Sequence, residues 1–214
     1  MKKSRLRKTE PFDFDADRAN VKRNKFFFLA AIFFFYISYN GLISSLSVYA
    51  TDVLNLSKGG FTIPQLLCMA SACAVAVPVS KLSKKLQKRH ILVIGMNIML
   101  VAFTLAATQN GLTPLMFACF IIAGAGYSVV IVNLYPYMLE LSDPGKIGRA
   151  TGIFNTVSTV AMVITPIASG ALQDSVGRFI LFPYCLAALM VSIVFFFFIK
   201  DKPAADDANA ASNA

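Results

Sequence analysis

Five hydrogen-bonding side chains lie inside otherwise apolar stretches of the sequence and are the first candidates for chemistry. They are Tyr39, Asn40, Asn133, Tyr135 and Asn155. The asparagine amides both donate and accept hydrogen bonds, and the tyrosines add an aromatic face that can stack on a ligand. Such a set could bind a small polar solute. The residues alone leave a second interpretation open, in which these side chains only join helices to one another.

Asp, Glu, Lys, Arg and His are missing from the middle of every apolar stretch. Ion-coupled carriers usually load their ion on a carboxylate inside the membrane, and hydrolytic enzymes there need His, Asp, Glu or an activated Ser. The single histidine, His90, lies in a basic segment. We therefore expect no enzymatic activity, no metal site and no cofactor. The four cysteines fall within the apolar stretches, where they act as small apolar residues.

Six apolar stretches must position these polar residues. Each contains about 17–24 residues, enough for a helix to cross a hydrocarbon layer of about 30 Å. A composition of 57% apolar and 14% charged residues also differs from that of a water-soluble domain. The sequence therefore predicts an all-α membrane protein, a bundle of six transmembrane helices. The predicted spans are 26–46, 61–79, 91–107, 115–135, 152–172 and 179–199.

The net charge of +9 follows the predicted topology. If the N-terminus is cytoplasmic, eighteen of the twenty Lys and Arg residues lie on the cytoplasmic side, and only Lys58 and Arg178 lie opposite. The positive-inside rule then places both termini in the cytoplasm. The basic charge is explained by this topology, so we expect no nucleic-acid partner. Residues 1–25 are predicted to be a disordered basic lead-in, 26–200 the bundle, and 201–214 a disordered tail.

Polar residues are unevenly shared among the spans. Spans one, four and five are rich in Ser, Thr, Asn and Tyr, so we expect them to face a cavity or one another. Spans three and six carry few such residues and are expected to face lipid. Glycines in spans four and five predict close helix approach; they are Gly124, Gly126, Gly152 and Gly170.

Two segments carry a resemblance to a known family. Residues 133–149 read NLYPYMLELSDPGKIGR, and span one contains Tyr39-Asn40-Gly41 followed by Val48-Tyr49-Ala50. Together with the sequence that follows residue 149, they resemble the second half of major facilitator superfamily carriers, above all bacterial relatives of sucrose–proton and glycoside–cation symporters. The resemblance covers about residues 26–200. It implies one six-helix repeat domain of the major facilitator fold, located in the bacterial plasma membrane.

The most specific part of the resemblance is Pro166-x3-Gly170-x3-Asp174-x2-Gly177-Arg178. Pro166 can bend the helix, Gly170 can allow close packing, and Asp174 can cap the helix or pair with Arg178 at the outer mouth. The alternative is a simple helix-ending turn. The resemblance also implies that Glu140 and Arg149 bracket a cytoplasmic loop and lock an inner gate. Here the alternative is an exposed ion pair worth less than about 1 kcal/mol.

The sequence also departs from the family. Ser80 and Gln87 stand where the loop between spans two and three usually has glycines, and the chain shows no counterpart of the first six helices. In ion-coupled relatives, that half holds most of the coupling carboxylates. We therefore predict a half-size secondary transporter subunit for a small polar solute, such as a sugar or glycoside. Its partners would be the lipid bilayer and a second six-helix bundle, either a second copy or a separate N-terminal half. The alternative is a truncated or regulatory membrane protein that does not transport.

Overall fold

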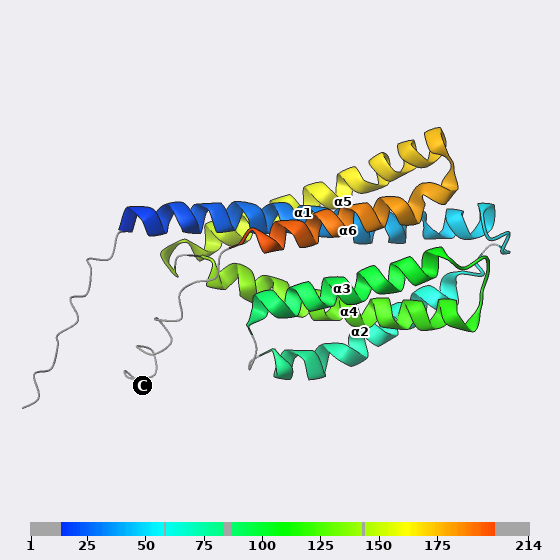
Figure 1. The fold of residues 1–214 in the computed structure, drawn as a ribbon, viewed down its shortest axis with the longest axis horizontal. Helices are drawn as coiled ribbons and strands as arrows, with labels where there is room; N and C mark the ends of the chain where they lie inside the picture. Colours follow the sequence, from blue (N-terminus) through cyan, green and yellow to red (C-terminus); the bar gives the residue numbers. More distant parts are fainter. Residues whose placement is uncertain (1–13, 58, 84–86, 143, 200–214) are drawn as a thin grey trace, which may run out of the picture.

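A computed structural model describes residues 14–57, 59–83, 87–142 and 144–199, and these residues form an all-helical bundle (Figure 1). Six helices are long and apolar enough to cross a membrane, as the sequence predicts. Two short 3-10 turns, η1 (Pro144–Lys146) and η2 (Arg178–Ile180), come directly before α5 and α6. The six helices are α1 (Phe14–Asp52), α2 (Thr62–Leu82), α3 (Lys88–Ala107), α4 (Pro114–Glu140), α5 (Ile147–Val176) and α6 (Leu181–Phe197).

The first helix begins well before the predicted span. Residues 14–25, predicted to be disordered, are instead the first turns of α1. The physical reason is local, because the sequence has no glycine or proline between Pro11 and Gly41 that would interrupt the helix. Asn24 is already buried, so this extension packs onto the rest of the bundle. The remaining predicted disorder, at residues 1–13 and in the tail at 201–214, lies outside the described residues.

The helices pack as an open chain of neighbours. The main contacts run from α2 to α4, α3, α6, α1 and finally α5. Exchanging α1 with α4, α2 with α5 and α3 with α6 gives the same order of contacts in the reverse direction, so the same pairs of helices are in contact. Because α1 and α4 run in opposite directions, this pattern is that of two inverted three-helix repeats. The two ends of the open chain are α2 and α5.

Burial differs from the expectation based on polar content. In the most apolar stretch of α3 and of α6, 44% of the residues are buried, as in α1 and α4. The corresponding share is 11% in α2 and 22% in α5. The expectation that spans three and six face lipid was therefore incomplete, because α3 and α6 also pack against each other. Their apolar side chains fill this helix–helix interface, while several polar residues of α5 lie on its open side.

Glycines set the closest approaches between helices. A Cβ added at Gly124 would lie 2.0 Å from the backbone oxygen of Cys68, so α2 and α4 are in backbone contact there. Gly126 and Gly95 make a similar reciprocal contact between α4 and α3. These contacts confirm the prediction for Gly124 and Gly126. The prediction was wrong for Gly152 and Gly170, because nothing lies within 4 Å of a Cβ built at either position.

The substitution Gly124→Ala should destabilise the bundle, because the added methyl group would overlap the backbone of α2. Overpacking of this kind costs about 1–3 kcal/mol or more. The matched substitution is Gly170→Ala, which fills open space and should gain about 0.5–1 kcal/mol from helix propensity. Thermal unfolding of the purified protein in detergent measures both effects. Equal melting temperatures for the two variants would contradict the assigned α2–α4 contact.

Candidate functional site

A stack of aromatic rings joins α1 to α4 near the middle of the apolar segment of each helix. The ring centroids of Tyr39 and Tyr127 lie 3.9 Å apart, and the ring planes differ by 13°. Phe35 extends the stack on the other side of Tyr127, with a centroid distance of 6.2 Å and an angle of 12°. Tyr39 lies midway between Phe26 and Asp52, and Tyr127 lies midway between the two ends of α4. In a membrane this position corresponds to the middle of the bilayer.

Three further side chains with polar groups lie next to this stack. Tyr36 is buried one turn before Tyr39, and its phenol lies near Ser158 of α5. The Cys68 thiol of α2 lies near Tyr39 and Tyr127. The midplane tyrosine cluster, defined as Tyr36, Tyr39, Cys68, Tyr127 and Ser158, thus joins α1, α2, α4 and α5. It offers aromatic faces, hydroxyl groups and a thiol.

The side-chain amides of Asn40 and Asn133 have partners in their own helices. The side-chain amide nitrogen of Asn40 donates to the carbonyl oxygen of Tyr36 at 2.9 Å. That of Asn133 donates to the carbonyl oxygen of Val129 at 2.7 Å, and the Asn133 side chain is 1% exposed. Asn133 therefore fits the structural alternative, while Asn40 remains half-buried beside Tyr39.

Tyr135 of α4 and Asn155 of α5 are not members of the cluster, and Asn155 lies one turn before its member Ser158. The Tyr135 side chain is 42% exposed, and its hydroxyl lies 3.3 Å from that of Thr151. The rings of Tyr135 and Phe154 pack edge to face. The next residue of α5, Asn155, is exposed. The five predicted solute contacts thus fall into two groups, and only Tyr39 belongs to the midplane tyrosine cluster.

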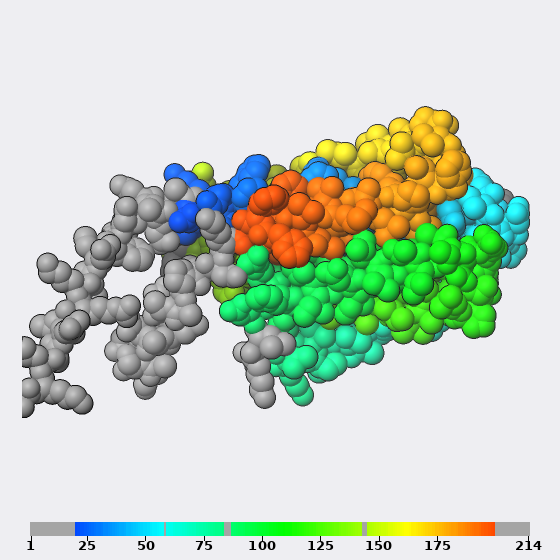
Figure 2. Space-filling view, viewed as in Figure 1, coloured from blue at the N-terminus to red at the C-terminus, as the bar shows by residue number. Residues whose placement is uncertain are grey.

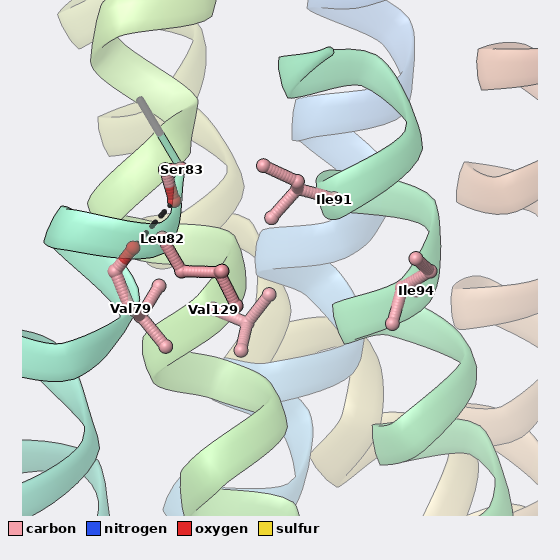
Figure 3. A pocket seen from close by; sticks show the side chains of 6 residues that line it. All are labelled: Val79, Leu82, Ser83, Ile91, Ile94 and Val129. Carbon is pink, nitrogen blue, oxygen red and sulfur yellow. Dashed lines mark hydrogen bonds between the residues drawn. The ribbon is translucent and has the colours of Figure 1, made fainter. Parts of the chain in front are cut away.

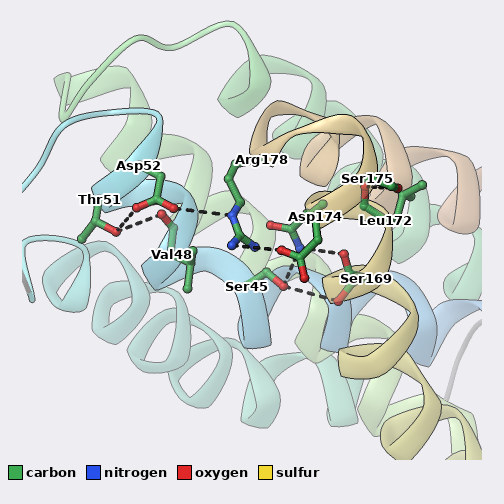
Figure 4. Close-up of polar contacts among 10 residues, drawn as sticks. Ser45, Val48, Thr51, Asp52, Ser169, Leu172, Asp174, Ser175 and Arg178 are labelled. Atoms are coloured by element: carbon green, nitrogen blue, oxygen red, sulfur yellow. Dashed lines mark hydrogen bonds and ion pairs between the residues drawn. The ribbon is translucent and has the colours of Figure 1, made fainter.

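An ion-pair network ties α1 to α5 at the end of the bundle where α1 ends (Figure 4). A guanidinium nitrogen of Arg178 lies 3.1 Å from Asp174, one turn earlier in the chain. Another nitrogen of the same group lies 3.5 Å from Asp52 at the end of α1. The predicted pairing of Asp174 with Arg178 is present in the structure. Asp52 is an additional partner that the sequence did not suggest.

A buried hydrogen-bond chain continues this network toward the middle of the bundle (Figure 4). The Gln173 amide nitrogen donates to the Ser45 hydroxyl at 2.8 Å and to the Ser169 carbonyl oxygen at 3.0 Å. The hydroxyls of Ser45 and Ser169 lie 3.3 Å apart, and Ser169 donates to the carbonyl oxygen of Pro166. Because Ser45 accepts from Gln173, its own hydrogen is available to Ser169, so the donors run in one direction from Gln173 to Pro166.

The predicted inner-gate pair is not formed. Glu140, at the end of α4, pairs with Lys88 at the start of α3, while the Arg149 side chain is exposed in the first turn of α5. The resemblance suggested a pair that brackets one loop. The structure instead ties α4 to α3, because these two helices pack closely along their length.

Two small grooves among the described residues at this end of the bundle do not suit a polar solute. One, of about 130 Å³, is lined almost entirely by aliphatic side chains of α2, α3 and α4, including Val79, Ile94 and Val129 (Figure 3). The other, of about 110 Å³, lies between α1, α4 and α5 beside Lys25. Within the described residues, no group of three or more His, Cys, Asp or Glu side chains could hold a metal ion.

The six apolar helices, their inverted repeats and the polar cluster halfway along them define an integral membrane protein built like a carrier domain. The family model described as Major Facilitator Superfamily matches residues 28–214. The chain belongs to the major facilitator superfamily, a family of membrane transporters for small solutes. The sequence had suggested this family. Membership in this family supports transport as the function, but the family match does not identify the solute that is transported.

The buried and exposed parts of the α1–α5 network should differ in their effect on stability. Gln173→Ala should lower the free energy of unfolding by about 1–3 kcal/mol, since it removes two buried hydrogen bonds and leaves a cavity. Arg178→Gln should cost less than about 1 kcal/mol, because its ion pairs are partly exposed. Thermal unfolding in detergent at low and high salt measures both. A larger cost for Arg178→Gln would show that the ion pairs, and not the hydrogen bonds, hold α1 to α5.

Proposed function

We propose that the chain is a half-size subunit of a secondary transporter and contributes the C-terminal six-helix bundle of an alternating-access carrier. The observation that carries this proposal is the stack of Tyr39 on Tyr127, near the middle of the apolar segments of the two helices that the inverted repeat exchanges. Carrier sites lie near the bilayer midplane at the interface between repeats. A second bundle would cover the open side between α2 and α5 and enclose the site.

The chemistry of the cluster suits a neutral solute with both polar and apolar faces, such as a sugar or glycoside. Aromatic rings can stack on the apolar face of a sugar ring, and phenol and serine hydroxyls can exchange hydrogen bonds with its hydroxyl groups. No charged side chain lies in the cluster. Tyr39 and Asn40 would contact the solute from α1, and Tyr135 and Asn155 would do so on its path toward the cytoplasm. Asn133 would support α4.

The networks at the two ends of the bundle would serve as gates. Arg178, held between Asp52 and Asp174, would close the outer mouth by tying α1 to α5. Pro166 would supply the bend about which the outer part of α5 moves, and Gly170 would leave room for that movement. At the inner end, Glu140 would exchange Lys88 for Arg149 when α5 approaches α4. The charge distribution supports cytoplasmic termini in a bacterial plasma membrane.

A second candidate function is a regulatory or truncated membrane protein that associates with a full-length carrier without transporting. One observation favours it: no Asp, Glu, Lys, Arg or His lies near the middle of any span. Such a bundle cannot load a coupling proton on a side chain of its own. In a two-bundle carrier, the partner bundle would have to supply the side chain that loads the coupling proton. The carrier would act as a symporter only if its partner bundle contained such a side chain.

Uptake measurements distinguish these functions. The chain is expressed in cells alone, or with a six-helix bundle encoded by a neighbouring reading frame, and uptake of labelled sucrose and of a β-glucoside is followed. The carrier proposal expects uptake only when both bundles are present. Liposomes containing the purified chain test whether two copies suffice. If neither the pair nor the homodimer moves any solute in a wider panel of neutral sugars, the regulatory alternative replaces the carrier proposal.

Substitutions at Tyr39 test the role of the aromatic stack in a transporting complex. Tyr39→Ala removes the ring and should raise the KM for the sugar about tenfold or more, because stacking and burial of one ring are worth about 1.4 kcal/mol. Tyr39→Phe keeps the ring and should change the KM much less.

The matched control for this series is Asn133→Ala, which removes a polar group that bonds its own helix. It should lower thermal stability and leave the KM of the folded protein unchanged. Loss of solute affinity in Asn133→Ala together with normal affinity in Tyr39→Ala would place the solute away from the midplane tyrosine cluster.

A further inference from the structure

A buried guanidinium nitrogen without a partner lies at the end of the bundle where α6 ends. It is Nη2 of Arg23, which makes no hydrogen bond within the described residues. Arg23 lies one turn before Phe27 on α1, and the rings of Phe27 and Phe198 stack with their centroids 5.5 Å apart. Phe198 directly follows α6, so Arg23 is close to the end of that helix. A buried donor of this kind costs free energy until an acceptor reaches it, and an anion is the strongest acceptor.

Other cations lie at the same end of the bundle. Arg89, near the start of α3, donates from Nη2 to the carbonyl oxygen of Phe197 at 3.4 Å. Lys22 is exposed on α1 next to Arg23. Among the described residues, no ion pair joins Lys22 or Arg23 to a carboxylate. The cations therefore come from two helices that pack against α6, and together they favour an anion at its end.

Aromatic rings continue from these cations along the seam between α1 and α6. The ring of Phe27 lies 5.5 Å from that of Phe198 and 6.2 Å from that of Phe195, and Phe34 stacks on Phe195 at 5.8 Å. Phe198 is 56% exposed, and the other three are half-buried. Because Phe27 and Phe34 are seven residues apart, this aromatic ladder extends about 10 Å along the helices. It offers an acyl chain a continuous apolar surface next to the cations.

The position of these groups matches the boundary between lipid headgroups and hydrocarbon. Lys22 and Arg23 precede residue 26, where the first predicted span begins, and Phe198 lies at the end of the last span. In the space-filling view, the first turns of α1 and the last turns of α6 lie side by side at one end of the bundle (Figure 2). The positive-inside rule places this end in the cytoplasmic leaflet, which contains anionic lipids. The lipid patch comprises the aromatic ladder and the cations Lys22, Arg23 and Arg89.

We infer that the lipid patch binds a phospholipid with an anionic headgroup from the cytoplasmic leaflet. Nη2 of Arg23 donates to a phosphate oxygen, Lys22 and Arg89 add positive charge, and an acyl chain lies along the aromatic ladder. A zwitterionic lipid also carries a phosphate, but the same cations repel its ammonium group. A soluble phosphate lacks the acyl chain and gains no contact with the rings.

A tryptophan at position 198 provides the probe, because the sequence contains no Trp. Phe198→Trp is reconstituted in phosphatidylcholine vesicles that contain a small fraction of a chain-brominated lipid, which quenches indole fluorescence on contact. Brominated phosphatidylglycerol should bind about tenfold more tightly at this position than brominated phosphatidylcholine. The matched control is Leu82→Trp. Leu82 is 59% exposed at the end of α2 beside Lys81, outside the lipid patch, and should show almost no preference.

Charge variants in the Phe198→Trp background identify the cations that select the lipid. Lys22→Gln together with Arg23→Gln should lower the preference for phosphatidylglycerol about tenfold, because each cation near the surface attracts anionic lipid. Lys81→Gln together with Lys146→Gln removes two exposed cations from the same end of the bundle and should leave the preference unchanged. Added glycerol phosphate should not reduce the quenching. A single symmetric peak in size-exclusion chromatography verifies that each variant folds, and Lys22→Gln alone replaces the first pair if that pair does not.

Equal quenching by the two lipids at Phe198→Trp would overturn the inference. Equal losses in the two pairs of charge variants would also overturn it, because the preference would then be a general attraction of anionic lipid to the basic end of the bundle. Loss of quenching on addition of glycerol phosphate would assign the site to a soluble phosphate instead. The measurement involves no transported solute, so its outcome is separate from that of the proposed function.

Discussion

The absence of water from the hydrocarbon core governs the rest of this structure. A polar side chain there needs a partner within the protein. Three serines meet this need by bonding the backbone of another helix: Ser38 bonds the Cys185 carbonyl, Ser192 that of Ala31, and Ser71 that of Ile121. These bonds fix the rotation of α1 against α6 and of α2 against α4. The position of every other polar group along these interfaces follows from that rotation.

The same constraint explains why the fold could be predicted and the contacts could not. Span length and composition are properties of single segments and can be read directly from the sequence. The prediction of six helices, which depends only on these properties, was therefore confirmed. Which faces meet depends on pairs of segments, such as Gly95 against Gly126, and no single span contains that information. The pairing of Glu140 with Lys88 instead of Arg149 is an example, because it requires knowing that α3 lies along α4.

The candidate site was predicted in part for the same reason. In the sequence, Tyr36 and Tyr127 are two tyrosines within apolar spans. Nothing in the sequence distinguishes them from tyrosines whose only role is to fill space between helices. Their importance comes from the packing of the bundle, which stacks Tyr127 of α4 on Tyr39 of α1. The one available signal was the recurrence of tyrosine at the centre of both spans. Asn133 had the stronger chemical signal, but its amide serves its own helix.

The stack and the α1–α5 network share the helix α1, so a movement of this helix affects both. Tyr39 and Ser45 lie on α1 within two turns, so a rotation of α1 that separates Tyr39 from Tyr127 also displaces Ser45 from Gln173. The side-chain amide oxygen of Gln173 is buried and has no hydrogen-bond partner in the described structure. An unpaired buried acceptor raises the free energy of this arrangement of α1 and α5. The difference in free energy between this arrangement and one in which the two helices separate is therefore smaller. The α1–α5 contact is thus stabilised by its hydrogen-bond donors and destabilised by one unpaired acceptor.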